Sequence, residues 1–117
     1  MNQFEIKKRE TRDVVILELA GYLDAHTVPQ FETALQKLVR EAHYKIIVNM
    51  TSLEYISSAG LGVLMGFIEE VRERGGDIKL SNLSERVYKV FDLLGFPALF
   101  EIVDAEEQAL HSFGESD

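Results

Sequence analysis

Residues 44–50 read YKIIVNM, and residues 58–74 read SAGLGVLMGFIEEVRER. The first stretch is short and nearly continuously apolar, which is typical of a central strand covered on both faces. The second stretch repeats apolar residues at helical spacing and is followed by Gly75 and Gly76, which end a helix well. A buried strand followed by an amphipathic helix predicts a parallel sheet with helices packed on it.

The sequence on either side extends this pattern. Residues 3–9 alternate between apolar and polar, and residues 14–19 are rich in β-branched side chains, so we expect a hairpin there. The expected strands are 3–9, 14–19, 44–50, 77–80 and 99–103, and the expected helices are 27–41, 58–74, one capped by Asn82 or Ser84, and one opened by a capping box of Asp104 with Glu107.

This order, ββαβαβαβα, predicts an α/β protein with a mixed, mostly parallel sheet of about five strands and about four helices. We found no internal repeat, low-complexity tract or linker in the sequence. We therefore expect a single domain over residues 4–113.

Composition excludes several classes of function. The 117 residues include no cysteine, and 12 basic against 20 acidic residues give a net charge of -8. Disulfides, thiol catalysis and sulfur-ligated zinc are excluded, and binding to nucleic acid or anionic lipid is disfavoured by repulsion. The three histidines have no partner at metal-ligand spacing, so we expect neither a metal nor a cofactor. The longest apolar run, 59–68, is about half a membrane span, and we expect a cytoplasmic protein.

The most unusual segment is residues 54–62, EYISSAGLG, where two serines lie between a buried strand and a helix. The first turn of a helix has free N–H groups and a partial positive charge, which favour a phosphate. Ser58 or Ser57 could therefore accept a phosphate, or either could simply be the N-cap. Gly60 and Gly62 indicate either close approach of another molecule to the backbone or close packing of the helix on the sheet.

Other polar residues also allow two interpretations. Asp24 is either a turn or cap residue or a group that faces a partner, and Thr27 with Gln30 forms a capping box at the start of a helix. We expect Asn49 to find a hydrogen-bond partner in the backbone near Ser57. The side chains of Tyr55, Leu61 and Met65 are expected to lie mostly in the core.

Enzyme motifs are not matched. A nucleophile elbow needs glycine two residues before the serine, but Ile56 precedes Ser58 and Tyr55 precedes Ser57. The glycines fit neither a dinucleotide fingerprint nor a phosphate loop with its lysine. A relay of Ser58, His26 and Asp24 can be drawn, but two members on one loop rarely reach triad geometry. We therefore expect a protein that is not an enzyme.

Four segments together resemble the anti-sigma factor antagonists, which are stand-alone STAS domains. Residues 21–24 (GYLD) resemble the turn after that family's second strand, and residues 46–50 (IIVNM) resemble its central strand. Residues 57–62 (SSAGLG) resemble its phosphoserine loop, and residues 75–77 (GGD) resemble the break before its next strand. The loop departs from the family pattern in having serine at Ser57, where aspartate is frequent, and alanine at Ala59.

The resemblance implies regulation by partner switching. The dephosphorylated protein would bind an anti-sigma factor that is a serine kinase of the GHKL type, and phosphorylation would end the complex until a PP2C-type phosphatase reverses it. The resemblance places the phosphoserine on Ser58, with Ser57 as the alternative. It implies a partner-binding set of Asp24, Thr27, Ser57, Ser58, Ala59, Gly60, Leu61 and Gly62. The competing hypotheses are a STAS scaffold that is never phosphorylated and a sensor of a small ligand or nucleotide.

Overall fold

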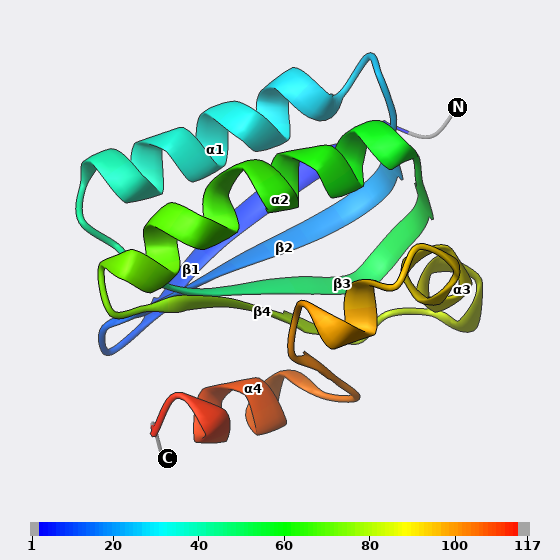
Figure 1. Cartoon of the computed structure of the whole chain (residues 1–117). Helices are drawn as coiled ribbons and strands as arrows, with labels where there is room; N and C mark the ends of the chain where they lie inside the picture. Colours follow the sequence, from blue (N-terminus) through cyan, green and yellow to red (C-terminus); the bar gives the residue numbers. More distant parts are fainter. Residues whose placement is uncertain (1–2, 115–117) are drawn as a thin grey trace.

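The computed structural model describes residues 3–114, which form one α/β layer structure (Figure 1). The strands are β1 (Glu5–Thr11), β2 (Val14–Leu23), β3 (Lys45–Ile56), β4 (Asp77–Ser81) and β5 (Ile102–Val103), and the helices are α1 (Val28–Arg40), α2 (Ser58–Glu73), α3 (Glu85–Leu93), the short 3₁₀ helix η1 (Phe96–Ala98) and α4 (Glu106–Ser112). In this part of the chain the strands form one sheet in the order β1-β2-β3-β4-β5. Only β1 with β2 is antiparallel, which confirms the predicted hairpin and the mostly parallel sheet.

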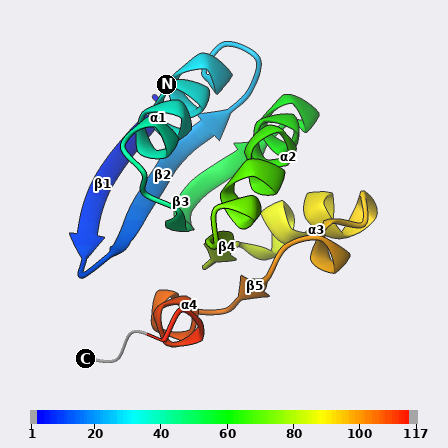
Figure 2. The ribbon, with the colours of Figure 1, turned by 60° about the vertical axis from the view of Figure 1, so that its left-hand side comes forward.

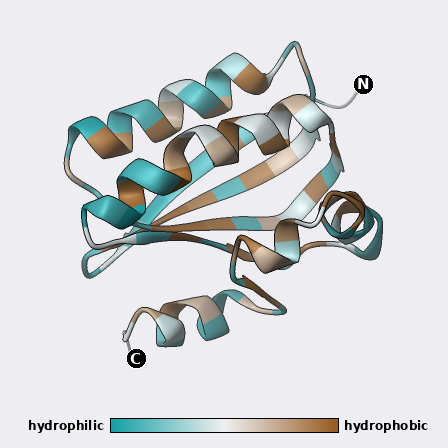
Figure 3. Ribbon diagram, viewed as in Figure 1, coloured by the Kyte–Doolittle hydropathy of each residue, from teal (hydrophilic) through white to brown (hydrophobic). Residues whose placement is uncertain are grey.

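The two faces of the sheet are covered unequally. Helices α1 and α2 lie side by side on one face, whereas α4 lies on the other (Figure 2). The larger core is under α1 and α2, and the apolar sides of both helices turn toward it (Figure 3). Under α4 the buried cluster is smaller and consists of Val14, Ile16, Ile47 and Ala109. Strand β2 alternates between these two cores, which explains its nearly continuous burial.

Strand β3 is longer than the sequence predicted. It pairs with β4 only from Lys45 to Asn49, whereas it pairs with β2 as far as Ile56. The predicted end at residue 50 was wrong because Thr51 and Ser52 are exposed, so they break the apolar run without ending the strand. The carboxyl half of β3 therefore projects beyond β4 and carries the chain directly to α2.

The end of the chain also differs from prediction. The strand expected at 99–103 is limited to Ile102–Val103, because η1 and a bend occupy the residues before it. Helix α4 begins after Ala105, whose N–H donates to Gln108 Oε1 at 2.8 Å, so the predicted box of Asp104 with Glu107 was wrong. The predicted cap at Ser84 is confirmed, since Ser84 Oγ accepts a hydrogen bond from Val87 N at 3.1 Å.

A polar cluster anchors α4 to the sheet. Glu106 Oε1 accepts hydrogen bonds from Arg9 of β1 at 2.7 Å and from Asn49 Nδ2 of β3 at 2.8 Å. The bond from Arg9 is the largest cause that holds the pKa of Glu106 below its ordinary value. The expected partner of Asn49 near Ser57 was wrong, because α4 supplies an acceptor that only the tertiary fold brings to β3.

Strand β1 is an edge of the sheet, and it carries three consecutive cations, Lys7, Lys8 and Arg9. All three side chains are exposed.

None of the helices in the described part of the chain combines the length and apolar character needed to cross a bilayer.

Candidate functional site

Two loops meet at the carboxyl ends of β2 and β3. Leu23 and Ile56 are paired at these ends, and Ser57 N donates a hydrogen bond to Leu23 O at 2.9 Å. The loop from Asp24 to Thr27 leads into α1, and Ser57 leads into α2, so both helices begin at the same end of the sheet (Figure 1). This edge is where open α/β sheets place their binding sites. The two segments that the family resemblance assigns to one binding set thus lie at the same end of the sheet.

The first loop is held by its own side chains. Asp24 Oδ1 accepts hydrogen bonds from His26 N at 2.9 Å and from Thr27 N at 3.3 Å. Thr27 Oγ1 accepts from Asp24 N at 2.9 Å and donates to Tyr22 O at 2.8 Å. Thr27 precedes α1 as predicted, but its side chain makes no capping bond, so the box with Gln30 was wrong. The hydroxyl closes the loop instead.

The second loop, at Ser57, is not closed by a side-chain capping bond. Ser57 is the N-cap residue of α2 and makes no side-chain capping bond. Its Oγ is buried and has no hydrogen-bond partner among the described residues. The first helical bonds run from Gly60 N and Leu61 N to Ser57 O, at 3.0 and 3.4 Å. The N–H groups of Ser58 and Ala59 come before them, at the electropositive end of the helix.

Ser58 and Ser57 differ in accessibility. Ser58, the first residue of α2, is exposed, as is Ala59 beside it. Ser57 is only partly exposed, and its hydroxyl oxygen is covered. In this conformation a reagent from solvent reaches the hydroxyl of Ser58 and not that of Ser57.

The two glycines of α2 have different surroundings. A Cβ on Gly60 would lie 2.9 Å from both Leu23 Cδ2 and Ile56 Cγ1, so Gly60 lets the helix pack closely on the ends of β2 and β3. A Cβ on Gly62 would meet nothing within 4 Å. Close packing therefore explains Gly60, whereas Gly62 leaves an uncovered stretch of helix on the exposed side. Leu61 is 2% exposed and belongs to the core, as predicted.

Three large side chains near the loops are more exposed than their sequence pattern suggests. Met65 on α2 is 44% exposed and Tyr55 on β3 is 43% exposed, so their expected core positions were wrong. Tyr22 on β2 is 36% exposed, and its ring stacks on that of Tyr55 with centroids 5.6 Å apart. No sequence pattern predicts this pair, because only the parallel register of β2 and β3 places the rings together.

The site shows no catalytic constellation in the described residues. His26 contacts Asp24 through its backbone N–H and not through its imidazole, so the relay drawn from sequence has no support. Among residues 3–114 no cluster of three or more histidine or acidic side chains is placed to hold a metal ion.

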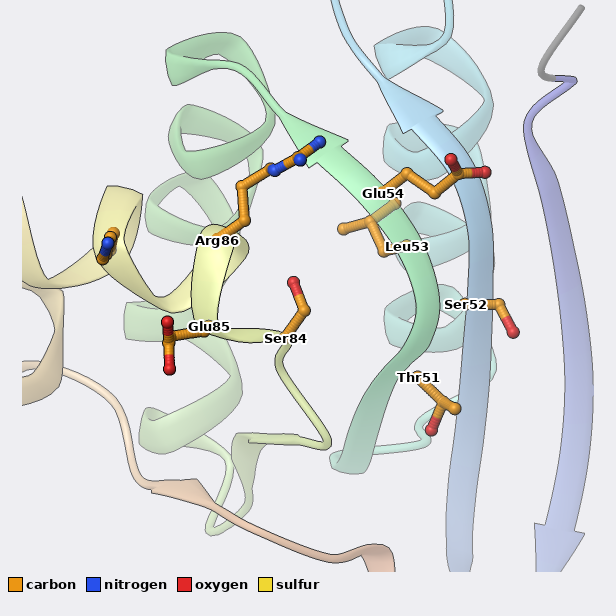
Figure 4. Close-up of a pocket in the computed structure, with 8 residues that line it drawn as sticks. Thr51, Ser52, Leu53, Glu54, Ser84, Glu85 and Arg86 are labelled. Carbon is orange, nitrogen blue, oxygen red and sulfur yellow. The ribbon is translucent and has the colours of Figure 1, made fainter.

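A separate open groove of about 860 Å³ lies on the other edge of β3, between residues 51–54 and the start of α3 (Figure 4). Its lining carries charges of both signs, from Glu54 and Glu85 and from Arg86 and Lys89. Neither Ser57 nor Ser58 lines this groove.

The chain is similar to known proteins over most of its length. A STAS domain family model matches residues 5–109. The anti-sigma-B factor antagonist of Listeria monocytogenes is 32% identical over 102 residues, which cover 87% of this chain and 89% of that protein. The anti-sigma factor antagonist SpoIIAA in its unphosphorylated form is 28% identical, with a TM-score of 0.80 and coverage of 98% of this chain and 100% of that one. The phosphorylated form of the Bacillus cell fate determinant SpoIIAA is also 28% identical, with a TM-score of 0.72 and coverage of 95% and 99%.

Proposed function

The chain belongs to the STAS domain family and, within it, to the anti-sigma factor antagonists, and from this premise we propose that it is a binding protein switched by phosphorylation of Ser58. In the unphosphorylated state it binds an anti-sigma factor that is a serine kinase of the GHKL type, in the cytoplasm. That kinase transfers the phosphoryl group from ATP to Ser58 Oγ, the hydroxyl proton is lost, and the complex ends. A PP2C-type phosphatase hydrolyses the phosphoester and restores binding.

The single observation that carries the proposal is the placement of Ser58. Its side chain is exposed at the first residue of a sixteen-residue helix, beside N–H groups that precede the first helical bonds. A phosphate there adds a charge of about -1.5 to -2, which the positive end of the helix stabilises. The fold therefore tolerates the modification, and the effect falls on whatever is docked there.

The docking surface in this proposal is formed by both loops. Ser58, Ala59 and Gly62 offer exposed backbone and small side chains, while Gly60 and Leu61 are buried and act by fixing the position of α2. Asp24 and Thr27 contribute the part of this surface next to α1. Ser57 belongs to the second loop and is bonded through its N–H to the end of β2. A phosphate on Ser58 adds bulk and negative charge to the docked surface, and it is repelled by any acidic group of the partner that faces it, at a cost of several kcal/mol.

The experiment maps the phosphate and measures its effect on binding. Candidate serine kinases and ATP are incubated with the protein, and the modified residue is located by mass spectrometry. We expect modification at Ser58, none in the Ser58→Ala variant, and normal modification in the matched Ser57→Ala variant. Modification of Ser58→Ala to the wild-type extent would transfer the site to Ser57.

Binding supplies the second readout. Ser58→Ala, used as bait in a native lysate, should hold an anti-sigma factor constitutively, and Ser58→Glu should hold it weakly. If Ser58→Ala, Ser58→Glu and the phosphorylated protein bind the same partner equally well, the unmodified scaffold replaces the switch as the function.

A further inference from the structure

The exposed tyrosine pair on the face of the sheet opposite α1 and α2 is an unexplained feature of the fold. Tyr22 and Tyr55 are paired across β2 and β3, and their ring planes are inclined by 32° to each other. Both remain exposed, at 36% and 43%. Helix α4 covers this face only over the other end of the strands, around Ile16 and Ile47. The two rings offer flat aromatic surface with a polar hydroxyl, which a side chain of another protein can contact.

The pair is continuous with the proposed switch surface. Tyr22 is two residues before Asp24, and its carbonyl accepts the hydrogen bond from Thr27 Oγ1. Tyr55 is two residues before Ser57, at the end of β3. The rings lie on the face opposite α1 and α2, so a partner that docks on the two loops meets them by extending around this end of the sheet.

The charges around the pair define what it can bind. Glu54 precedes Tyr55, is exposed, and extends from β3 toward β2 (Figure 4). Glu5 of β1 is paired with Ala20 of β2, two residues before Tyr22. The cation nearest along β1, Lys7, is paired with Glu18 in the following row. Carboxylates thus lie on the β1 and β2 side of the pair, whereas the cations Arg86 and Lys89 lie on α3, across the groove on the other edge of β3.

We propose that Tyr22, Tyr55 and Glu54 receive an arginine side chain from the partner protein, which makes them the specificity-determining part of the interface. The inference rests on the proposed function for the existence of the partner. A guanidinium group is planar, so it stacks on a tyrosine ring while it donates two hydrogen bonds to a carboxylate. A lysine would pair with the charge of the carboxylate, but it would neither stack on the ring nor donate two parallel hydrogen bonds.

The first test is photo-crosslinking in cells of the source organism, with p-benzoylphenylalanine placed at position 22, 55 or 62, one at a time. Position 62 reports on the proposed docking of α2, and positions 22 and 55 report on this inference. We expect crosslinks from all three positions to the same partner protein, with the crosslinked peptide from 22 or 55 adjoining an arginine. Crosslinks from position 62 but not from 22 or 55 overturn this inference and leave the proposed function unaffected. The absence of crosslinks from all three positions counts against this inference and against the proposed function.

The second test measures the affinity of that partner for purified variants. Tyr55→Ala and Tyr22→Ala should each raise the dissociation constant about 2- to 30-fold, the range of a cation–aromatic contact. Glu54→Gln should weaken binding as well, and Tyr88→Ala, at a tyrosine that is 38% exposed on α3, should leave it unchanged. In a double-mutant cycle with alanine at the partner arginine, the effect of Tyr55→Ala should vanish. Additive effects, or equal weakening by Tyr88→Ala, overturn the proposal.

Discussion

The two loops at the end of the sheet are held in opposite ways. The loop from Asp24 to Thr27 is closed by hydrogen bonds of its own carboxylate and hydroxyl. Within residues 3–114, the turn at Ser57 is held by backbone bonds, and its hydroxyl has no hydrogen-bond partner. The second turn is positioned instead by Gly60, which packs against Leu23 and Ile56. The side chains of the first loop thus hold the fold together, whereas at the second turn the exposed hydroxyl of Ser58 remains open to modification.

The largest expected effect tests whether packing alone positions the second turn. Gly60→Val should lower the free energy of unfolding by about 1–3 kcal/mol, because the new side chain overpacks the contact with Leu23 and Ile56. Gly62→Ala is the matched control, and it should raise that free energy by about 0.5–1 kcal/mol, since it meets open space in a helix. Urea unfolding of both variants measures the difference, and equal effects would contradict the packing role of Gly60.

The next effect tests the hydrogen bonds of the first loop. Thr27→Val keeps the shape but removes the bonds to Asp24 N and Tyr22 O, so it should cost about 1–2 kcal/mol of stability. Ser57→Ala removes a hydroxyl that has no partner and should be neutral or slightly stabilising. The same urea titrations compare them. A larger loss for Ser57→Ala would show that the hydroxyl of Ser57 is bonded in solution.

A smaller effect separates the structural role of Asp24 from its charge. Asp24→Ala should cost about 1 kcal/mol, as removal of a capping side chain does, because the N–H groups of His26 and Thr27 lose their acceptor. Asp24→Asn keeps an acceptor oxygen and should keep most of the stability. If Asn nevertheless changes the affinity for the partner, measured by calorimetry, the charge acts in docking. If neither variant alters affinity, Asp24 serves only the loop.

The smallest effect concerns Glu106, which lies outside both loops. Its folded-state pKa is lowered from 4.5, mainly by the hydrogen bond from Arg9, so its stabilising effect is complete above about pH 4.5 and is lost as the pH falls through the folded value. Glu106→Gln should cost about 0.5 kcal/mol at pH 7, as a partly exposed ion pair does. As the pH falls below the folded-state pKa of Glu106, the variant and the wild type should converge in thermal unfolding. A constant difference at all pH values would contradict the ion pair.

Sequence periodicity predicted the order of the elements, because burial on both faces of β2 and β3 leaves a clear apolar signal. The grouping of Asp24 with the serine loop came only from the family resemblance. Prediction from periodicity failed for features that depend on contacts between residues far apart in the sequence. The true length of β3 depends on pairing with β2 beyond residue 50, and the partner of Asn49 comes from α4, which is 57 residues away in sequence.

The exposure of large side chains near the site was also not predicted from the sequence. Met65 falls on the apolar stripe of α2 by spacing, yet it lies at the margin of that stripe and faces solvent. Tyr55 is exposed because its neighbour Ile56 points into the core, and successive strand residues point to opposite faces. Capping boxes at Thr27 and Asp104 were plausible locally, but Thr27 makes bonds to the loop backbone and Gln108 replaces Glu107 at α4.

The cations on the edge strand β1 have a consequence for assembly. An uncovered strand edge templates the addition of further strands, and filaments can grow from it. Charged side chains on an edge strand oppose such addition, because pairing with another strand would bury them; on β1 these are Lys7, Lys8, already paired with Glu10, and Arg9, already paired with Glu106. The charges on β1 thereby oppose polymerisation through this edge of the sheet.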